Sequence, residues 1–106
     1  MVEFSKNEII PAIGVRMKIC KRAVVSGRVQ GVFFRHATQQ QALALGIKGW
    51  VRNLPSGEVE CLLCGEEEMV EKLCAWLHQG PPAANVAQVK IESTAWEEHE
   101  DFTILR

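Results

Sequence analysis

An arginine lies where the sequence predicts the first turn of a helix, directly after a glycine-containing loop. The stretch reads GRVQGVFFR, residues 27–35, and the residues from Phe34 onward have helical spacing. A cation in a first turn is unfavourable by roughly 0.3–1 kcal/mol, because the helix dipole is positive there. An anion bound in the loop would remove this conflict, since Arg35 would then gain a charge-assisted partner. The position of Arg35 therefore indicates an anion site, and an ordinary turn with a solvated surface arginine is the alternative.

The residues of this loop are suited to holding a phosphate group. Gly27 and Gly31 allow the backbone to curl so that successive N–H groups point inward and form an anion-binding nest. The helix N-terminus adds unpaired N–H donors and a partial positive charge, and the planar guanidinium of Arg35 can bind two oxygens. Residues 27–34 contain no Ser, Thr, Cys, Asp or His. A reaction there would use water as the nucleophile, without a covalent intermediate.

Other phosphate-binding motifs do not fit the chain. It has neither a G-x-x-x-x-G-K-[ST] nucleotide loop nor a G-x-G-x-x-G dinucleotide motif. Cysteine-based phosphatases place a cysteine six residues before their arginine, and here that position is Val29. His36 adjoins Arg35 and could tune the site, although an inert and partly exposed histidine is the commoner arrangement.

Hydrophobic periodicity predicts the elements that must position this loop. The predicted strands are 17–27, 47–53, 58–64 and 86–93 with an edge strand at 101–106, and the predicted helices are 34–45 and 66–79. The residues expected to face the core are Ile19, Ala23 and Val25, Phe34, Ala37, Ala42 and Leu45, Val59, Cys61 and Leu63, and Met69, Val70, Leu73 and Leu77. Gly46 and Gly80 suit helix ends, and LPSG at 54–57 is a turn sequence.

The resulting order, β-α-β-β-α-β, predicts an α+β fold of the ferredoxin-like, split-βαβ type. Two helices would cover one face of an antiparallel sheet. Strands 17–27 and 47–53 would run parallel with strand 58–64 between them, so their C-terminal ends would meet at one edge of the sheet. Asn53, at the end of strand 47–53, is therefore expected near the loop that follows strand 17–27.

The pair GRVQGVFFR and GWVRN resembles the signature of the acylphosphatase family, and the resemblance covers residues 18–106. It implies hydrolysis of the carboxyl–phosphate bond of acyl phosphates, giving carboxylate and inorganic phosphate without a metal or other cofactor. It further implies that Arg35 binds the phosphate and that Asn53 orients the attacking water. The backbone N–H groups that would cradle the phosphate belong to Gln30, Gly31, Val32, Phe33 and Phe34. A small acyl phosphate is the expected substrate, and inorganic phosphate or sulfate the expected ligand.

The length and composition are those of one ordinary domain. The chain has 106 residues and a formal net charge of −1. Residues 1–57 carry nine Lys or Arg against two Glu, whereas residues 58–106 carry three against eleven Asp or Glu. This asymmetry suggests a local positive field, or a chance split of solvated faces. We expect an N-terminal extension of uncertain order at 1–16 and a domain at 17–106, in a cytoplasmic monomer without a membrane partner.

Two further possibilities remain open. Cys61 and Cys64 cannot easily share a metal, because residues three apart on a strand face opposite sides. Cys20 and Cys64 could instead face each other on paired strands, so a disulfide is an alternative to free thiols.

A non-catalytic anion-binding or RNA-binding module of the same fold is the main functional alternative. RNA is disfavoured because EVECLLC, residues 58–64, lacks the aromatic residues on which bases stack.

Overall fold

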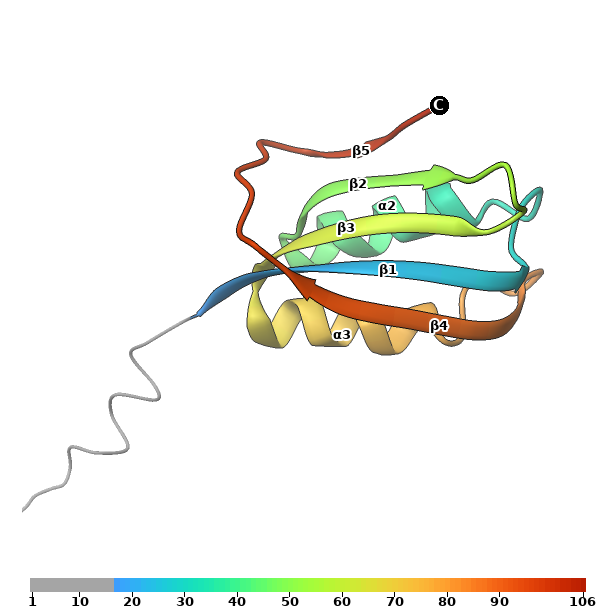
Figure 1. The fold of residues 1–106 in the computed structure, drawn as a ribbon, viewed down its shortest axis with the longest axis horizontal. Coiled ribbons are helices and arrows are strands. Elements are labelled where there is room, and N and C mark those ends of the chain that lie inside the picture. Colours follow the sequence, from blue (N-terminus) through green and yellow to red (C-terminus); the bar gives the residue numbers. More distant parts are fainter. Residues whose placement is uncertain (1–16) are drawn as a thin grey trace, which may run out of the picture.

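The computed structural model describes residues 17–106, so the predicted extension at 1–16 lies outside the described residues. The strands are β1 (Lys18–Arg28), β2 (Lys48–Asn53), β3 (Val59–Glu66), β4 (Asn85–Thr94) and β5 (Phe102–Ile104), and the helices are α2 (Phe34–Leu45) and α3 (Glu67–Leu77). Both helices lie behind one face of a single sheet (Figure 1). The predicted ferredoxin-like order is confirmed, and the predicted bounds lie within two residues of those observed.

The sheet has the strand order β4-β1-β3-β2-β5. β3 pairs antiparallel with both β1 and β2, so β1 and β2 are parallel, as predicted. The prediction of an antiparallel sheet is wrong at one edge, because β5 pairs with β2 in parallel and makes the sheet mixed. β4 is antiparallel to β1 and therefore ends where β2 begins. The chain then crosses that end of the sheet and adds β5 in the direction of β2 (Figure 1).

The face of the sheet that packs against the helices holds the main core. Its buried apolar residues include Ala23, Val25, Val51, Val59, Cys61 and Leu63 from the strands, and Phe34, Ala42, Val70, Leu73 and Leu77 from the helices. Each large apolar side chain buried in this way contributes about 1.5–3 kcal/mol. Thr38, which the sequence analysis did not place in the core, is fully buried, and its hydroxyl donates a 2.8 Å hydrogen bond to the carbonyl of Phe34.

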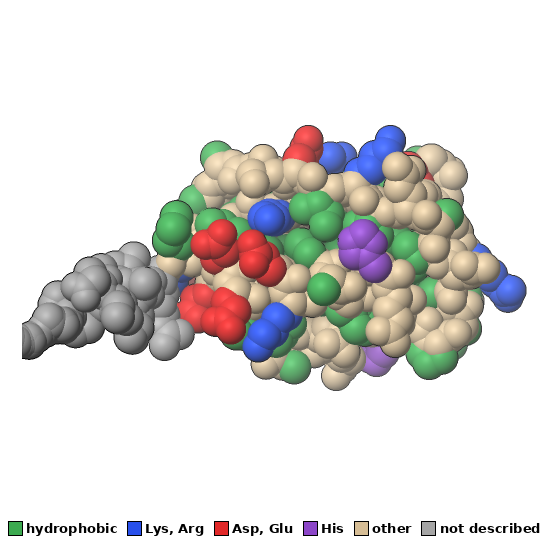
Figure 2. All heavy atoms as spheres, turned by 90° about the horizontal axis from the view of Figure 1, so that it is seen from below, with side chains coloured by type: hydrophobic (Ala, Val, Ile, Leu, Met, Phe, Trp, Pro, Cys, Tyr) green, Lys and Arg blue, Asp and Glu red, His purple; other side chains and the backbone are tan. Residues whose placement is uncertain are grey.

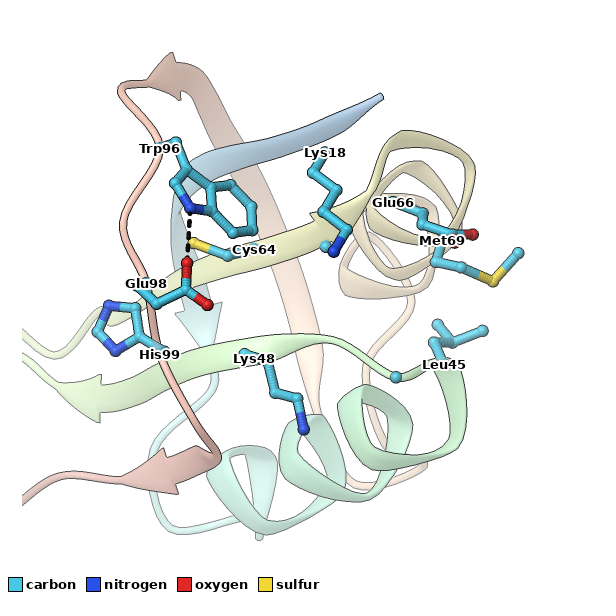
Figure 3. Close-up of a pocket in the computed structure, with 11 residues that line it drawn as sticks. Lys18, Leu45, Lys48, Cys64, Glu66, Met69, Trp96, Glu98 and His99 are labelled. Carbon is cyan, nitrogen blue, oxygen red and sulfur yellow. Dashed lines mark hydrogen bonds between the residues drawn. The ribbon is translucent and has the colours of Figure 1, made fainter. Parts of the chain in front are cut away.

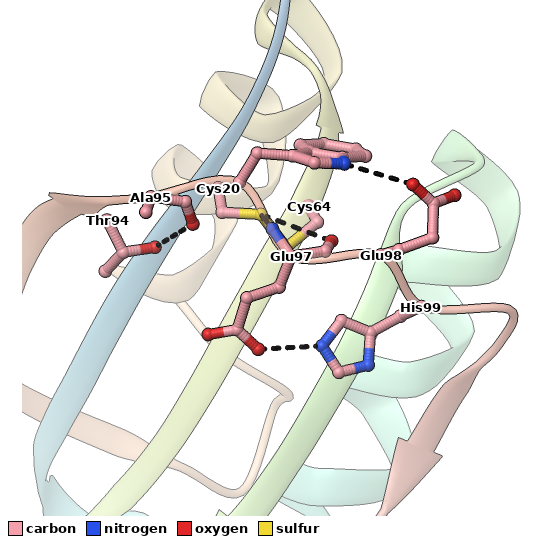
Figure 4. The surroundings of a disulfide bond; sticks show 8 residues. Cys20, Cys64, Thr94, Ala95, Glu97, Glu98 and His99 are labelled. Carbon is pink, nitrogen blue, oxygen red and sulfur yellow. Dashed lines mark hydrogen bonds and ion pairs between the residues drawn. A yellow bond between two sulfur atoms is a disulfide. The ribbon is translucent and has the colours of Figure 1, made fainter.

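The opposite face of β3 is also covered, which the alternating pattern did not predict. Glu60, Leu62 and Cys64 are all buried there. Cys64 forms a disulfide with Cys20, its cross-strand partner on β1, with 4.1 Å between their Cα atoms. The segment between β4 and β5 passes over this bond, and the backbone N–H of Glu97 donates to the sulfur of Cys20 at 3.3 Å (Figure 4). A disulfide between Cys20 and Cys64 was one of the two alternatives, with free thiols, that the sequence left open.

The register of the strands brings the loop after β1 and the end of β2 to one edge of the sheet. Val25 of β1 and Asn53 of β2 both lie opposite Val59 of β3. The loop and the β2–β3 turn accordingly lie at the same end of the molecule (Figure 1). Gly27 was predicted both as the last residue of the first strand and as the first glycine of the loop; it lies in β1, where the register with β4 shifts. Its φ is +118°, and a Cβ there would come within 2.3 Å of the carbonyl of Asn85.

Candidate active site

A pocket of about 270 Å³ opens between the β1–α2 loop, the first turn of α2, the end of β2 and β5. Its lining residues are Val29, Gly31, Phe33, Phe34, Arg35, His36, Asn53 and Ile104. Five of these were predicted as site residues, namely Gly31, Phe33, Phe34, Arg35 and Asn53. The structure therefore places the predicted arginine and the predicted asparagine on the same small cavity, although they come from different elements.

The loop between β1 and α2 adopts a conformation with unpaired donors. Gly31 and Phe33 both have left-handed backbone angles, with φ of +76° and +63°. Phe33 is the only non-glycine residue with positive φ among residues 17–106, and such a conformation costs on the order of 1–3 kcal/mol. Within the same described range, no backbone N–H from Gln30 to Phe34 donates a hydrogen bond to a protein acceptor. Strain and free donors together are typical of a ligand-binding loop.

The two helices differ at their N-termini. α3 has Glu67 and Glu68 in its first turn, which complement the helix dipole. The first turn of α2 has no acidic residue, and its N-cap, Phe33, makes no side-chain capping bond. Arg35 lies in that turn, half-buried, and no residue in the described part of the chain forms an ion pair with it. The positive end of α2 is thus left open toward the pocket, as the position of Arg35 in the sequence suggested.

Asn53 lines the same pocket and carries an unsatisfied acceptor. It is the last residue of β2, and its side-chain Oδ1 is buried without a hydrogen-bond partner. A buried polar atom left unpaired costs on the order of 1–3 kcal/mol, which makes such an atom a candidate for binding a ligand or a water molecule. Its amide group can both accept and donate, so Asn53 can hold a water molecule in a defined orientation.

Two predicted loop residues do not line the pocket. Val32 is 6% exposed and packs in the main core, which anchors the middle of the loop. The side chain of Gln30 points to the β2–β3 turn, where its Nε2 donates to the carbonyls of Leu54 and Glu58 at 2.9 and 2.8 Å. Their predicted contribution was through the backbone N–H groups, which remain unpaired within residues 17–106.

Three pocket residues were not predicted as site residues. Val29 lies in the loop itself, and its position two residues before Gly31 could have indicated a wall of the cavity. His36 was considered from its position beside Arg35, and the structure places it, exposed, on the pocket rim. Ile104 gave no sequence signal, because it reaches the pocket only through the parallel pairing of β5 with β2.

Charge is distributed unevenly around the fold. Acidic side chains gather at the left of the face shown in Figure 2, at the end where α3 begins. The β1–α2 loop lies at the opposite end of the sheet, and neither Asp nor Glu lines its pocket.

Among the described residues, no three His, Cys, Asp or Glu side chains are arranged to hold a metal ion. Within the same range, no helix is long and apolar enough to cross a membrane.

A larger cavity of about 470 Å³ lies at the other end of the strands. Lys18, Lys48, Trp96, Glu98 and His99 line it (Figure 3). The indole N–H of Trp96 donates to Glu98 at 3.1 Å, so these two polar groups already satisfy each other. Among residues 17–106, the buried side-chain oxygen without a hydrogen-bond partner belongs to Asn53 and not to a residue of this cavity, so the smaller pocket is the better candidate site.

Comparisons with known proteins identify the family of this chain. The family model "Acylphosphatase" matches residues 21–104. An acylphosphatase of Acaryochloris marina is 50% identical over 83% of this chain and 95% of its own length, and one of Colwellia psychrerythraea is 48% identical over 83% and 99%. The solved acylphosphatase of Coxiella burnetii has a TM-score of 0.81 and 42% identity over 83% of this chain and 93% of its own. That of Bacillus subtilis has a TM-score of 0.81 and 33% identity, over 85% and 100%. The chain therefore belongs to the acylphosphatase family.

Proposed function

We propose that this protein hydrolyses acyl phosphates to a carboxylate and inorganic phosphate in the pocket at the β1–α2 loop. Family membership supports the reaction class. The observation that carries the site is the meeting of Arg35, the loop N–H groups and the unpaired Oδ1 of Asn53 on one cavity. Phosphate and sulfate are expected to bind in the same place.

The phosphoryl group would be held from two sides. The N–H groups of the loop from Gln30 to Phe34 would donate to its oxygens, and the N-terminus of α2 would add its positive potential. Arg35 would contribute a guanidinium that can bind two oxygens at once. During transfer, charge spreads over the equatorial oxygens of the phosphoryl group, so donors already in place stabilise the transition state without rearranging.

Asn53 would position the nucleophile. Its Oδ1 would accept a hydrogen bond from the attacking water, whose oxygen forms the new bond to phosphorus. The bond between phosphorus and the acyl oxygen breaks, and the carboxylate leaves with the electron pair. The water proton passes to a phosphoryl oxygen of the substrate, which completes the balance. A carboxylate is a good leaving group, so positioning and charge stabilisation can suffice where no general base is provided.

Hydrolysis of benzoyl phosphate without added metal tests this proposal. For Arg35→Gln we expect loss of inorganic phosphate binding together with at least about a 100-fold fall in turnover. For Asn53→Ala we expect a similar fall in turnover with phosphate binding retained, because Asn53 contacts the water rather than the phosphate. Arg28→Gln and Asn85→Ala are matched controls, since both residues are exposed and outside the pocket. A wild-type protein that binds phosphate without turnover would indicate the non-catalytic alternative.

We further propose that the protein works as a cytoplasmic monomer without a nucleic-acid partner. The face of β3 that is turned away from the helices carries the buried Glu60 rather than an exposed aromatic residue, which disfavours base stacking. In the cytoplasm, where disulfides are uncommon, the Cys20–Cys64 pair would be held as two thiols and would form the disulfide on exposure to an oxidising environment. Cell fractionation tests the location. Thiol alkylation of acid-quenched, unfolded protein from each fraction tests whether Cys20 and Cys64 are paired there. Recovery in the cytoplasmic fraction supports it, and recovery elsewhere contradicts it.

A further inference from the structure

The side chain of Gln30 links the phosphate loop to the turn that follows Asn53. Its Nε2 donates to the carbonyl of Leu54 at 2.9 Å and to that of Glu58 at 2.8 Å. Both amide hydrogens of Gln30 are therefore used, and both bonds cross from the β1–α2 loop to the β2–β3 connection. Among the described residues, no other side chain of the loop hydrogen-bonds to that connection.

The two acceptors belong to a turn that is already closed by backbone hydrogen bonds. The N–H of Leu54 donates to the carbonyl of Glu58 at 2.8 Å, and the N–H of Gly57 donates to the carbonyl of Leu54 at 3.0 Å. Gln30 adds a second hydrogen bond to each of these two carbonyls. The turn can thus form without Gln30, and what Gln30 adds is the position of the loop relative to the turn.

The two linked segments carry the two halves of the site. Gly31 follows Gln30 and lines the pocket on the phosphate-binding side, whereas Asn53 precedes Leu54 and lines it on the other. Each hydrogen bond of Gln30 therefore runs from the first residue of the proposed phosphate cradle to the turn that follows Asn53. The strand register fixes Asn53 against Val59, but it does not fix the loop, which lies beyond the end of β1.

We propose that Gln30 is a positioning residue, which uses these two hydrogen bonds to set the distance between the bound phosphoryl group and the water held by Asn53. This inference rests on the proposed function. It predicts that Gln30 contributes to turnover rather than to phosphate affinity. The groups that bind phosphate all belong to the β1–α2 loop and the start of α2, so breaking the link to the β2–β3 turn leaves them together. Small displacements of reacting groups can lower a rate by about 100-fold.

Three substitutions separate the hydrogen bonds from the volume of the side chain. Gln30→Met keeps the length and removes both donors. Gln30→Glu keeps the shape but places a carboxylate against two carbonyl oxygens. Gln30→Asn keeps the amide on a stem that is one methylene shorter. Gln40→Met is the matched control, because Gln40 is exposed on α2 and outside the pocket.

With benzoyl phosphate, we expect kcat to fall by about 10–100-fold in all three variants, while KM and inhibition by inorganic phosphate change less than about threefold. Gln40→Met should match the wild type. A kcat within about threefold of the wild type in Gln30→Met would overturn the inference, as would a loss of phosphate affinity equal to the loss of rate. Thermal unfolding of each variant confirms that the assayed protein is folded.

A double-mutant cycle distinguishes positioning from a general structural role. If Gln30 acts through Asn53, Gln30→Met should lower the rate of the Asn53→Ala variant by less than about threefold. Additive losses would overturn the inference. An Asn53→Ala variant that retains the wild-type rate would contradict the proposed function itself, so the two failures are distinguishable.

Discussion

Arg52 donates a 2.7 Å hydrogen bond from its Nε to the carboxylate of Glu60, on the face of the sheet that carries no helix. Arg22 donates to the other carboxylate oxygen, and Glu60 is only 3% exposed. Burial favours the neutral form of Glu60, but the hydrogen bonds from Arg52 and Arg22 outweigh burial and hold its pKa below the usual range. Arg52 also lies 5.2 Å from the ring centroid of Trp50. Arg52 is therefore committed to this cluster rather than to the anion field suggested by the sequence.

The depressed pKa of Glu60 predicts a loss of stability in acid. A carboxyl whose pKa is lower in the folded state stabilises the fold above its unfolded pKa, about 4.3 for Glu. That stability is lost as the pH falls through the folded pKa. We expect the free energy of unfolding, measured with urea between about pH 7 and pH 3, to fall below about pH 4.3. Glu60→Gln should lower stability at neutral pH by roughly 1–3 kcal/mol and flatten the acid dependence.

Glu100→Gln is the control for this pH series. Glu100 is exposed and has no partner among the described residues, so its removal should leave both the neutral stability and the acid dependence close to those of the wild type. Equal acid dependence in Glu60→Gln and the wild type would assign the acid sensitivity to other carboxyl groups.

The Cys20–Cys64 disulfide predicts a redox-dependent stability. The two cysteines are 44 residues apart, and a cross-link of that span stabilises by about 2–4 kcal/mol through restriction of the unfolded chain. We expect the Cys20→Ala/Cys64→Ala variant to lose about this amount in urea unfolding without reductant. Activity on benzoyl phosphate should persist at temperatures where the variant is folded, because the bond is outside the candidate pocket.

The double variant also supplies the control. Reductant should lower the stability of the wild type toward that of Cys20→Ala/Cys64→Ala and should not affect the variant. In the folded protein, burial raises the pKa of Cys61 and of Cys74 and keeps both as neutral thiols. If reductant leaves the free energy of unfolding of the wild type unchanged, even when it is added to the unfolded protein, Cys20 and Cys64 are not paired in solution.

His36 lines the pocket but has no place in the proposed reaction. The substrate supplies its own proton acceptor, and the leaving carboxylate needs no general acid. We therefore expect His36→Gln to retain turnover of benzoyl phosphate within about threefold, with an unchanged dependence on pH. A fall of about 100-fold or more would indicate that His36 acts as an acid or base.

The predictable parts of this fold are those set by local pattern and by topology. Gly46 ends α2 with φ of +70°, and the parallel course of β1 and β2 follows from the βαβ crossover. That topology sufficed to predict that Asn53 and Arg35 would meet at one edge of the sheet. Arg35 breaks the rule that the first turn of a helix disfavours basic side chains, and this departure suggested the anion site.

What could not be predicted depends on contacts between distant segments. Glu60 is polar and alternates with the core residues of β3, so the pattern places it in solvent. It is buried because Arg22 and Arg52 on the neighbouring strands cover it. Thr38 is buried because its hydroxyl is satisfied by the carbonyl of Phe34, one helical turn earlier. The direction of β5, and with it the place of Ile104, depends on where β4 ends.

Phe33 gives a direct test of backbone strain in the candidate phosphate loop. Its φ is +63°, and its side chain is 82% exposed. Asn tolerates this left-handed conformation, whereas a β-branched residue does not. We expect Phe33→Val to be about 1–2 kcal/mol less stable than Phe33→Asn in urea unfolding. Both variants remove the same exposed ring, and because Asn can also cap α2 from this N-cap position, Phe33→Gly, which accepts positive φ without a capping side chain, is the control. Equal stabilities would mean that residue 33 leaves the left-handed region in solution, and the cradle of N–H donors would then lose its geometric basis.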